Sequence, residues 1–447
     1  MIAGFINTFR IKDLRKKILF TIGLIAVYRI GAFVPTPGIN GQALSAFFES
    51  LADTPGGSLL GMINMFSGGA IQRLTIFALG IMPYISASII LQVLTPVIPA
   101  LERIAHQDNG RQKINQYTRY LTVIITLFQA FFISLWLENP QSFQGYQIVF
   151  NPGWAFRFTT VLTLVTGTMF IVWLGEQITE FGIGNGISLI ITAGIISRMP
   201  AALIQLYSLV DPFSPAGGQI QPFTLVIMAM MLVLVVVAIV LITQGQRKIP
   251  VQYARRVIGR RVYGGQSTFI PLRINQAGVI PIIFAQSVLM FPATIAGFFK
   301  NEGVNKIVAL FSSGSILYYV LYSGLIIFFS YFYTALVFNP KDVAENMKKH
   351  GGFIPGVRPG KNTSEHLDHI MTRIILPGAV FLAIIAVLPS LVSATLHIPF
   401  LVASFFGGTG LLIIVGVLLD TERQLESQLM MRQYEGFMKK GRIRGRK

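Results

Sequence analysis

A strongly cationic segment lies between two long apolar stretches, from Gln244 to Arg273. It carries no acidic residue and seven basic ones: Arg247, Lys248, Arg255, Arg256, Arg260, Arg261 and Arg273. A link between two membrane helices needs only a few polar residues, and this one has the length and charge to reach an anionic partner. Cytoplasmic loops of membrane proteins are basic in general, because positive charge fixes topology. The charge alone therefore leaves both interpretations open.

Residues suited to catalysis are scarce. The chain has no cysteine, no HExxH pattern and no Walker A sequence. The run Gly182–Gly186 leads into an apolar span with no strand before it, which favours a tight turn at a helix entry over a dinucleotide site. His366 and His369 lie beside Glu365 and Asp368, a pattern more typical of a solvated loop than of a metal site. We expect neither an enzyme nor a cofactor or metal centre.

The elements that position these residues are apolar spans. The chain is 53% hydrophobic and 12% charged, whereas about a quarter of residues are charged in a soluble domain. A membrane-spanning helix needs about 20 mostly apolar residues. Ten segments qualify: 18–34, 74–95, 121–137, 158–175, 187–206, 222–243, 276–298, 316–338, 373–392 and 398–419. Because backbone groups inside a bilayer pair within their own segment, we expect an all-α polytopic membrane protein with ten transmembrane helices.

Charge sets the orientation of these spans. With a cytoplasmic N-terminus, 30 of the 36 Lys and Arg residues fall on the cytoplasmic side, so we expect both termini there. No cleavage site follows the first span, which we expect to be retained. A Pro- and Gly-rich linker at 211–221 divides the chain into halves 1–210 and 211–447, with five spans each and opposite topology, as in inverted repeats. Since no residue-level repeat is evident, an unsymmetrical bundle is the alternative.

Leu59–Gln72 is apolar but too short to cross a membrane, and it contains a glycine pair. It predicts a short re-entrant helix that plugs a cavity, with an amphipathic interfacial segment as the alternative. Ile81 and Ile85, like Ile187 and Ile191, are four residues apart on one helical face, where they suit either a dry constriction or ordinary packing. No carboxylate lies in the middle of a span, which argues against the alternative function, a small-molecule secondary transporter.

Several long strings resemble the SecY family, the channel subunit of the bacterial Sec translocon. They are FSGGA and RLTIFALGIMPYISASIILQ (66–92), WLGEQITEFGIGNGIS (173–188), QSTFIPLRINQAGVIPIIFA (266–285), FYTALVFNPKDVAENMKKHGGFIPGVRPG (332–360) and FFGGTGLLI (405–413). The resemblance runs from about residue 10 to the tail, in the same order as in the family. It implies a clamshell of two halves in the bacterial plasma (inner) membrane. The resemblance further implies a channel that passes unfolded secretory proteins and releases membrane-protein helices sideways through a lateral gate.

The resemblance also implies four groups of site residues. The hydrophobic pore ring falls on Ile81, Ile85, Ile187, Ile191, Ile283 and Ile413. The plug region falls on Asn64, Met65, Phe66, Ser67, Gly68 and Gly69. The polar cluster of the lateral gate falls on Ser86, Gln129 and Asn275. The docking loops at 244–273 and 339–372 carry Arg255, Arg256, Arg260, Arg261 and Arg358.

The partners implied by the resemblance bind at these loops or in the membrane. Ribosomal RNA offers phosphates that arginine can bind in bidentate fashion, and the motor ATPase SecA offers an acidic and polar surface. The small membrane subunits SecE and SecG, membrane lipids and polypeptides with signal sequences complete the expected set. Because the chain has no nucleotide site, we expect a partner or the membrane potential to supply the energy.

Overall fold

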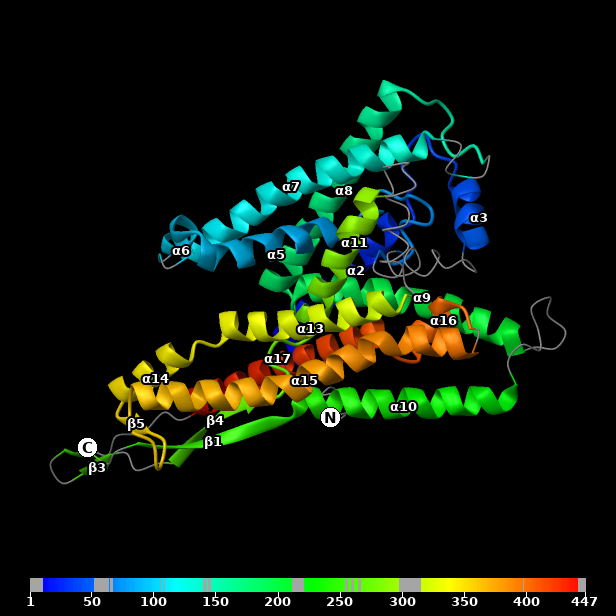
Figure 1. Cartoon of the computed structure of the whole chain (residues 1–447). Helices are drawn as coiled ribbons and strands as arrows, with labels where there is room; N and C mark the ends of the chain where they lie inside the picture. The colour runs from blue at the N-terminus through cyan, green and yellow to red at the C-terminus, as the bar shows by residue number, and fades with distance from the viewer. Residues whose placement is uncertain are drawn as a thin grey trace.

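The computed structural model describes residues 11–51, 64, 67–105, 107, 109–139, 143, 146–210, 221–253, 256–258, 261–263, 267–296, 315–396 and 398–440. Its fold is predominantly helical (Figure 1). The helices are α2 (Lys12–Gly31), α3 (Gly41–Leu51), α5 (Met82–Val97), α6 (Pro99–Ala105), α7 (Gly110–Leu137), α8 (Trp154–Phe181), α9 (Gly186–Val210), α10 (Pro222–Gln244), α11 (Ile280–Ala296), α13 (Ile316–Val337), α14 (Pro340–Lys349), α15 (Lys361–Leu396), α16 (Phe400–Phe405) and α17 (Thr409–Lys440).

The helical membrane class is confirmed. Within the described ranges, seven helical segments are long and apolar enough to cross a membrane, and the pair α5–α6, bent by 102°, adds an eighth. The other two predicted spans coincide with α2 and the shorter apolar helix α11. Each of the ten predicted spans therefore contains a helix, while the count of ten crossings stays a prediction. Several helices extend beyond the predicted spans because their ends are polar, and hydropathy does not detect polar helix.

The beginning of the second span was predicted wrongly. The expected helix from residue 74 begins only at Met82, and residues 67–81 form successive turns. Leu74 and Gly80 have positive φ angles of 42° and 56°, which a right-handed helix does not accommodate. Residues 74–76 instead bond the backbone of 34–36, through Thr36 N to Leu74 O and Ile76 N to Val34 O. Apolar residues of this segment, such as Leu74 and Phe77, are therefore buried without being part of a helix.

The expected short helix over 59–72 is likewise only partly confirmed. Asn64 is helical, but residues 67–72 are turns; residues 59–63, 65 and 66 lie outside the described part of the chain. Gly68 and Gly69 adopt φ angles of 65° and 87°, left-handed values that end any right-handed helix. The sequence predicted a helix here because the segment is apolar, and an apolar segment of this length is compatible with either a helix or buried turns.

The helices form two groups that are visible in Figure 1, with α5, α7 and α8 above and α10, α13, α15 and α17 below. In the first group α7 contacts both α5 and α8, and in the second α13 contacts α15. Two helices connect the groups: α9 contacts α8 and α17, and α11 contacts α5 and α13. The division after residue 210 stays a prediction, since α9 packs against helices of both proposed halves.

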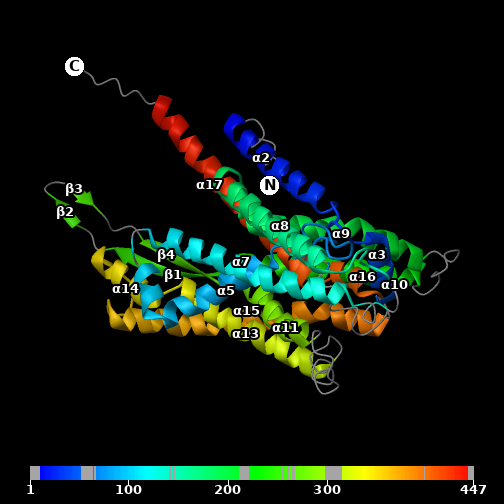
Figure 2. The same ribbon diagram turned by 90° about the horizontal axis from the view of Figure 1, so that it is seen from above.

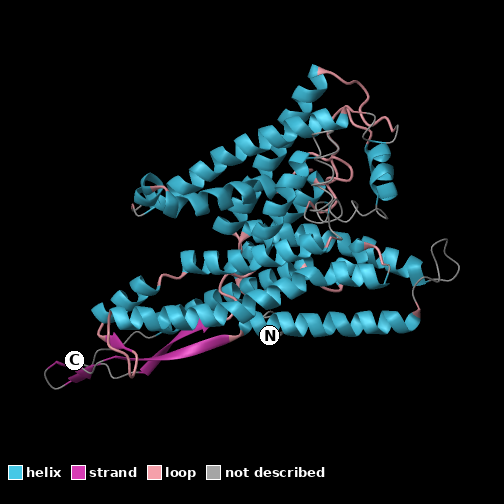
Figure 3. Cartoon of the chain, in the orientation of Figure 1, coloured by secondary structure: helices cyan, strands magenta, loops and turns pink. Residues whose placement is uncertain are grey.

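The cationic segment at 244–273 forms β-structure that the all-α prediction did not include. Strands β1 (Gln246–Tyr253), β4 (Ser267–Arg273) and β5 (Gly352–Phe353) make an antiparallel sheet in the order β4–β1–β5. Strands β2 (Arg256–Ile258) and β3 (Arg261–Tyr263) pair at its tip. The strands gather at one end of the molecule, and the tip projects from it (Figures 2 and 3).

Physical chemistry explains the sheet. Ile249 and Val251 alternate with exposed residues along β1, the period of a strand with one buried face. Their buried side chains pack in one cluster with Met347 of α14, Ile354 after β5 and Leu367 of α15. One further prediction is corrected nearby: His366 and His369 are solvent-exposed, as expected, but they lie on helix α15 rather than in a loop.

Candidate functional site

The structure brings the six isoleucines of the expected ring into one hydrophobic cluster. They come from α9, α11 and α17, from α5 and from the residue that precedes α5. Five of them are at most 9% exposed, and Ile187 is partly buried against the same cluster. Four chain segments thus contribute isoleucine side chains to the same large hydrophobic cluster.

One face of α9 runs from this cluster to the plug region. Ile187, Ile191, Gly194 and Arg198 are spaced by four, three and four residues, so they lie along a single stripe of the helix. Gly68 rests on this stripe: a Cβ atom at its position would lie 3.0 Å from the Cα of Gly194. The predicted ring residues of α9 and the predicted plug therefore share one helix face.

The described part of the plug region is closed by its own hydrogen bonds. The Asn64 side chain donates to Gln72 Oε1 at 3.2 Å and accepts from the Gln72 backbone N–H at 3.3 Å. The Ser67 hydroxyl donates to the Asn64 carbonyl at 3.2 Å and accepts from Ile71 N–H at 3.3 Å. Asn64 and Ser67 are buried. These bonds satisfy polar groups that the loop would otherwise bury unpaired.

Two arginines that sequence reasoning did not assign hold this loop from outside. Arg29 of α2 donates from Nη1 to the Gly68 carbonyl at 3.3 Å. Arg198 of α9 donates from Nη1 to Gln72 Oε1 at 3.2 Å. Both belong to the few basic residues that lie outside the expected cytoplasmic segments. A cation within or beside an apolar span was the signal that could have found them, because such residues are usually functional.

The three predicted gate residues lie on neighbouring elements. Ser86 is on α5, Gln129 is on α7 and Asn275 precedes α11, and α5 contacts both α7 and α11. Asn275 is buried, and the other two are half-buried. All three are described, and no hydrogen bond recorded for the described residues joins two of them. Their gate role stays a prediction.

Sequence reasoning missed a buried amide next to the predicted gate. Gln286 lies on α11, one turn beyond Ile283, and is 2% exposed. Neither its Oε1 nor its Nε2 has a hydrogen-bond partner among the residues that the structure describes. Such an unpaired amide destabilises the conformation that buries it, by about 1–3 kcal/mol. The free energy would be recovered in any conformation that lets the amide find a partner.

Three of the five predicted docking arginines lie in the described part of the chain. Arg358 is exposed between β5 and α15, where its carbonyl accepts from Thr363 Oγ1 at 2.9 Å. The backbones of Arg256 and Arg261 lie in the β2–β3 pair, whereas Arg255 and Arg260 lie outside the described residues. The β1–β5 pairing connects the loop at 244–273 to the loop at 339–372, so two regions distant in sequence form one unit.

The carboxylates near the spans have structural partners. Glu176 of α8 pairs with Arg119 of α7 at 2.8 Å, and Glu138 pairs with Arg157 at 2.6 Å. Glu176 lies in the last two turns of α8, and Glu138 directly follows α7. A carboxylate already paired with arginine is a poor proton carrier, which gives no support to an ion-coupled transporter.

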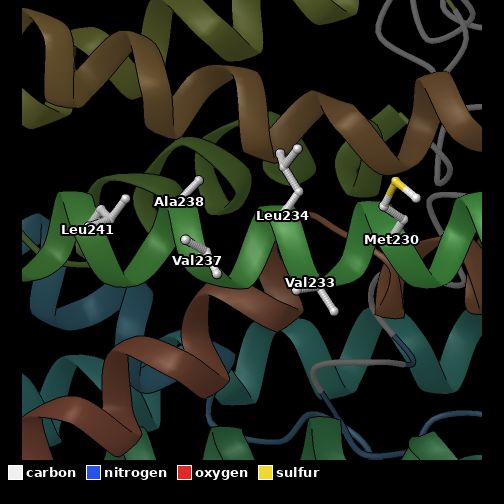
Figure 4. Close-up of a pocket in the computed structure, with 6 residues that line it drawn as sticks. All are labelled: Met230, Val233, Leu234, Val237, Ala238 and Leu241. Carbon is white, nitrogen blue, oxygen red and sulfur yellow. The ribbon is translucent and has the colours of Figure 1, made fainter.

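A shallow groove lies on the outer face of α10. Its lining is entirely apolar: Met230, Val233, Leu234, Val237, Ala238 and Leu241 (Figure 4). Most of these side chains are highly exposed. With no polar group to orient a ligand, the groove is typical of a lipid-facing helix rather than of a binding site.

Comparison with known proteins gives a consistent picture. A SecY family model matches residues 75–422. The chain is 46% identical to the protein translocase subunit SecY of Aquifex aeolicus, over 97% of this chain and 98% of that protein. It is 47% identical to the protein of the same name from Escherichia coli strain K12, over 97% and 96%. A solved structure described as that of a protein conducting channel has a TM-score of 0.60 at 18% identity, covering 92% of this chain and 91% of the other. The chain belongs to the SecY family.

Proposed function

We propose that this chain is the protein-conducting channel of a protein translocase. It passes unfolded secretory polypeptides across the membrane and releases membrane-protein helices sideways through a lateral gate. The observation that carries the proposal is the convergence of six isoleucines from four segments in one buried cluster. The relatives of this chain in Aquifex aeolicus and Escherichia coli are named protein translocase subunit SecY, which also supports the proposal. The role is passive and non-enzymatic.

A ring of isoleucines suits this task physically. Aliphatic side chains make no hydrogen bonds, so they can close around a polypeptide of any sequence. When the channel is empty, a dry apolar constriction impedes ions because it does not replace their hydration. The plug segment beside Gly194 provides a second closure at a different level of the same channel.

The lateral gate lies between α5 and α7 on one side and α11 and α13 on the other. Support comes from the contact between α5 and α11 and from the placement of Ser86, Gln129 and Asn275 around it. An apolar signal helix opens the gate by replacing helix–helix contacts with contacts of its own. Interhelical polar contacts in membranes contribute about 1 kcal/mol or less each, so such an exchange is energetically accessible.

The sheet and the Arg358 loop form the docking platform for the partner that drives translocation. Ribosomal RNA phosphates and the ATPase SecA are the two candidates, and SecE and SecG are the expected membrane subunits. The platform is cytoplasmic, both termini lie on its side, and the membrane is the bacterial inner membrane. The support is the concentration of 30 of 36 basic residues on that side.

Reconstitution tests the proposal. The complex purified from its native membrane, placed in lipid vesicles with SecA and ATP, should render an unfolded secretory substrate resistant to added protease. Removal of the signal sequence from the substrate should abolish this protection. Uptake of small solutes without any protection of polypeptide would overturn the proposal in favour of a secondary transporter. Recovery of a lone monomer with no affinity for SecA or ribosomes would overturn it as well.

A further inference from the structure

We propose that Arg29 and Arg198 form a cationic latch that holds the plug segment, residues 64–72, in the closed channel. The inference rests on the plug role proposed above and adds the residues that control its release. The two arginines come from different helices, α2 and α9, and bind two different points of the segment. The segment is therefore fixed at both its glycine turn and its Gln72 end.

The chemistry of the contacts favours a latch. A guanidinium donates charge-assisted hydrogen bonds, which are stronger than neutral ones. Neither arginine has a carboxylate partner among the ion pairs of the described residues. The Nε of Arg198 is buried, with no hydrogen-bond partner in the described part of the chain. The Gly68 carbonyl and Gln72 Oε1 thus accept from these two half-buried cations, and leaving a partly desolvated cation without an acceptor is costly.

The loop is shaped to fit between the arginines. A Cβ at Gly69 would lie 2.9 Å from Nη1 of Arg198, and a Cβ at Gly68 would lie 3.0 Å from Nη1 of Arg29. Both glycines have the positive φ angles that side chains rarely adopt. Gln72 completes the arrangement, since its Oε1 accepts from both Arg198 and Asn64. The internal bonds of the loop and the external latch share this one atom.

The latch also accounts for release. An extended polypeptide carries unpaired backbone carbonyls, the same type of acceptor as the Gly68 carbonyl. A chain that enters the pore offers these carbonyls to the guanidiniums and so replaces the plug without leaving the half-buried cations unpaired. An exchange of acceptors has a lower free-energy cost than breaking the contacts outright.

Thiol labelling tests the latch. The chain contains no cysteine, so S67C introduces its only thiol, at a buried position of the plug. The complex in vesicles is treated with a membrane-impermeant maleimide from the side opposite the docking platform. R29Q and R198Q should each accelerate labelling about tenfold or more, as expected for loss of a charge-assisted bond. Q72L removes the acceptor of Arg198 from the plug side and should also accelerate labelling. This variant tests the latch even if an arginine variant does not fold.

Arg73 provides a matched control. It lies near Arg29, because both guanidiniums contact the ring of Phe33. The distance to the ring centroid is 5.6 Å for Arg73 and 5.3 Å for Arg29. Its side chain makes no hydrogen bond to another described residue. R73Q removes the same charge and should leave the labelling rate unchanged. Equal acceleration by R73Q would overturn the latch in favour of a general charge effect.

The remaining outcomes separate the latch from the plug. If R29Q, R198Q and Q72L all label at the parent rate while deletion of residues 64–69 raises ion leak, the plug stands and the latch is overturned. If S67C is labelled rapidly in the parent channel at rest, the plug role itself fails. Unchanged thermal unfolding of the arginine variants confirms that labelling reports plug position and not loss of the fold.

Discussion

Gln252 of β1 lies opposite Phe353 of β5 in an antiparallel pair, with Tyr253 opposite Gly352 as the next pair. These few residues join two loops that are distant in sequence. The shared cluster beneath them, which contains Val251 and Ile354, makes the joint a packed unit. A partner that binds Arg358 would therefore meet strand β1 in a fixed relation to it.

The joint predicts that G352V weakens docking without removing any charge. A Cβ at Gly352 would lie 2.9 Å from Cε1 of Tyr253, so a valine displaces the ring or the strand, at about 1–3 kcal/mol. We expect reduced affinity in ribosome cosedimentation and in SecA binding. G324V is the control, since a Cβ at Gly324 meets nothing within 4 Å. Parent affinity in G352V would show that the loops bind independently.

Charge reversal at Arg358 should block translocation. The side chain is exposed, so R358E should accumulate in the membrane at parent levels while substrate protection falls by at least about tenfold through like-charge repulsion. K361E reverses the same charge three residues away, at a side chain 88% exposed and only loosely paired with Glu365 at 3.7 Å. We expect at most about a twofold effect there. Loss of R358E from the membrane would indicate a structural role instead.

Replacement of Ile81, Ile85 and Ile191 by glycine should raise the ion conductance of the resting channel, because the dry constriction loses the side chains that exclude water. Planar bilayer recordings measure this directly. The control is the double variant I90G and I196G. Ile90 lies on α5 and Ile196 on α9, but their side chains are 41% and 43% exposed. A resting conductance equal to that of this control would count against the ring.

Deletion of Asn64–Gly69 should also raise resting leak, since it removes the glycine turn that rests on Gly194 together with the contact to Arg29. The leak should flicker if neighbouring segments refill the space, so single-channel recording is the suitable measurement. A deletion channel as tight as the parent removes the plug assignment.

The unpaired amide of Gln286 predicts a substitution that stabilises the closed state. Q286M keeps the shape and removes the buried polar atoms, which should raise the unfolding temperature and slow translocation of substrates with weak signal sequences. S287A should not raise the unfolding temperature, because the Ser287 hydroxyl is already satisfied by the Ile283 carbonyl at 2.8 Å. A lower unfolding temperature in Q286M would mean that the amide has a partner in the membrane.

The sequence predicted the helices well because span length and hydropathy follow directly from the bilayer. It failed at residues 74–81, because an apolar run indicates burial and not helicity. The sheet was missed because β1 shows its alternation over only Ile249 and Val251, within a segment dominated by charge. Sequence patterns could not predict contacts between residues that are distant in the chain. Arg198 and Gln72 are an example, because nothing in their types or spacing indicates that they meet.

The turns at residues 67–81 have a mechanical consequence. They place the glycine turn and the residues Ile81 and Ile85 on different backbone structures, turns before Met82 and helix after it, so the two are not parts of one continuous helix. On the plug and ring roles proposed above, the channel would have two barriers in series. A passing ion would have to find both open at once, so a leak would need two openings to coincide. A membrane that stores its energy as an ion gradient benefits from such redundancy each time a polypeptide leaves the pore.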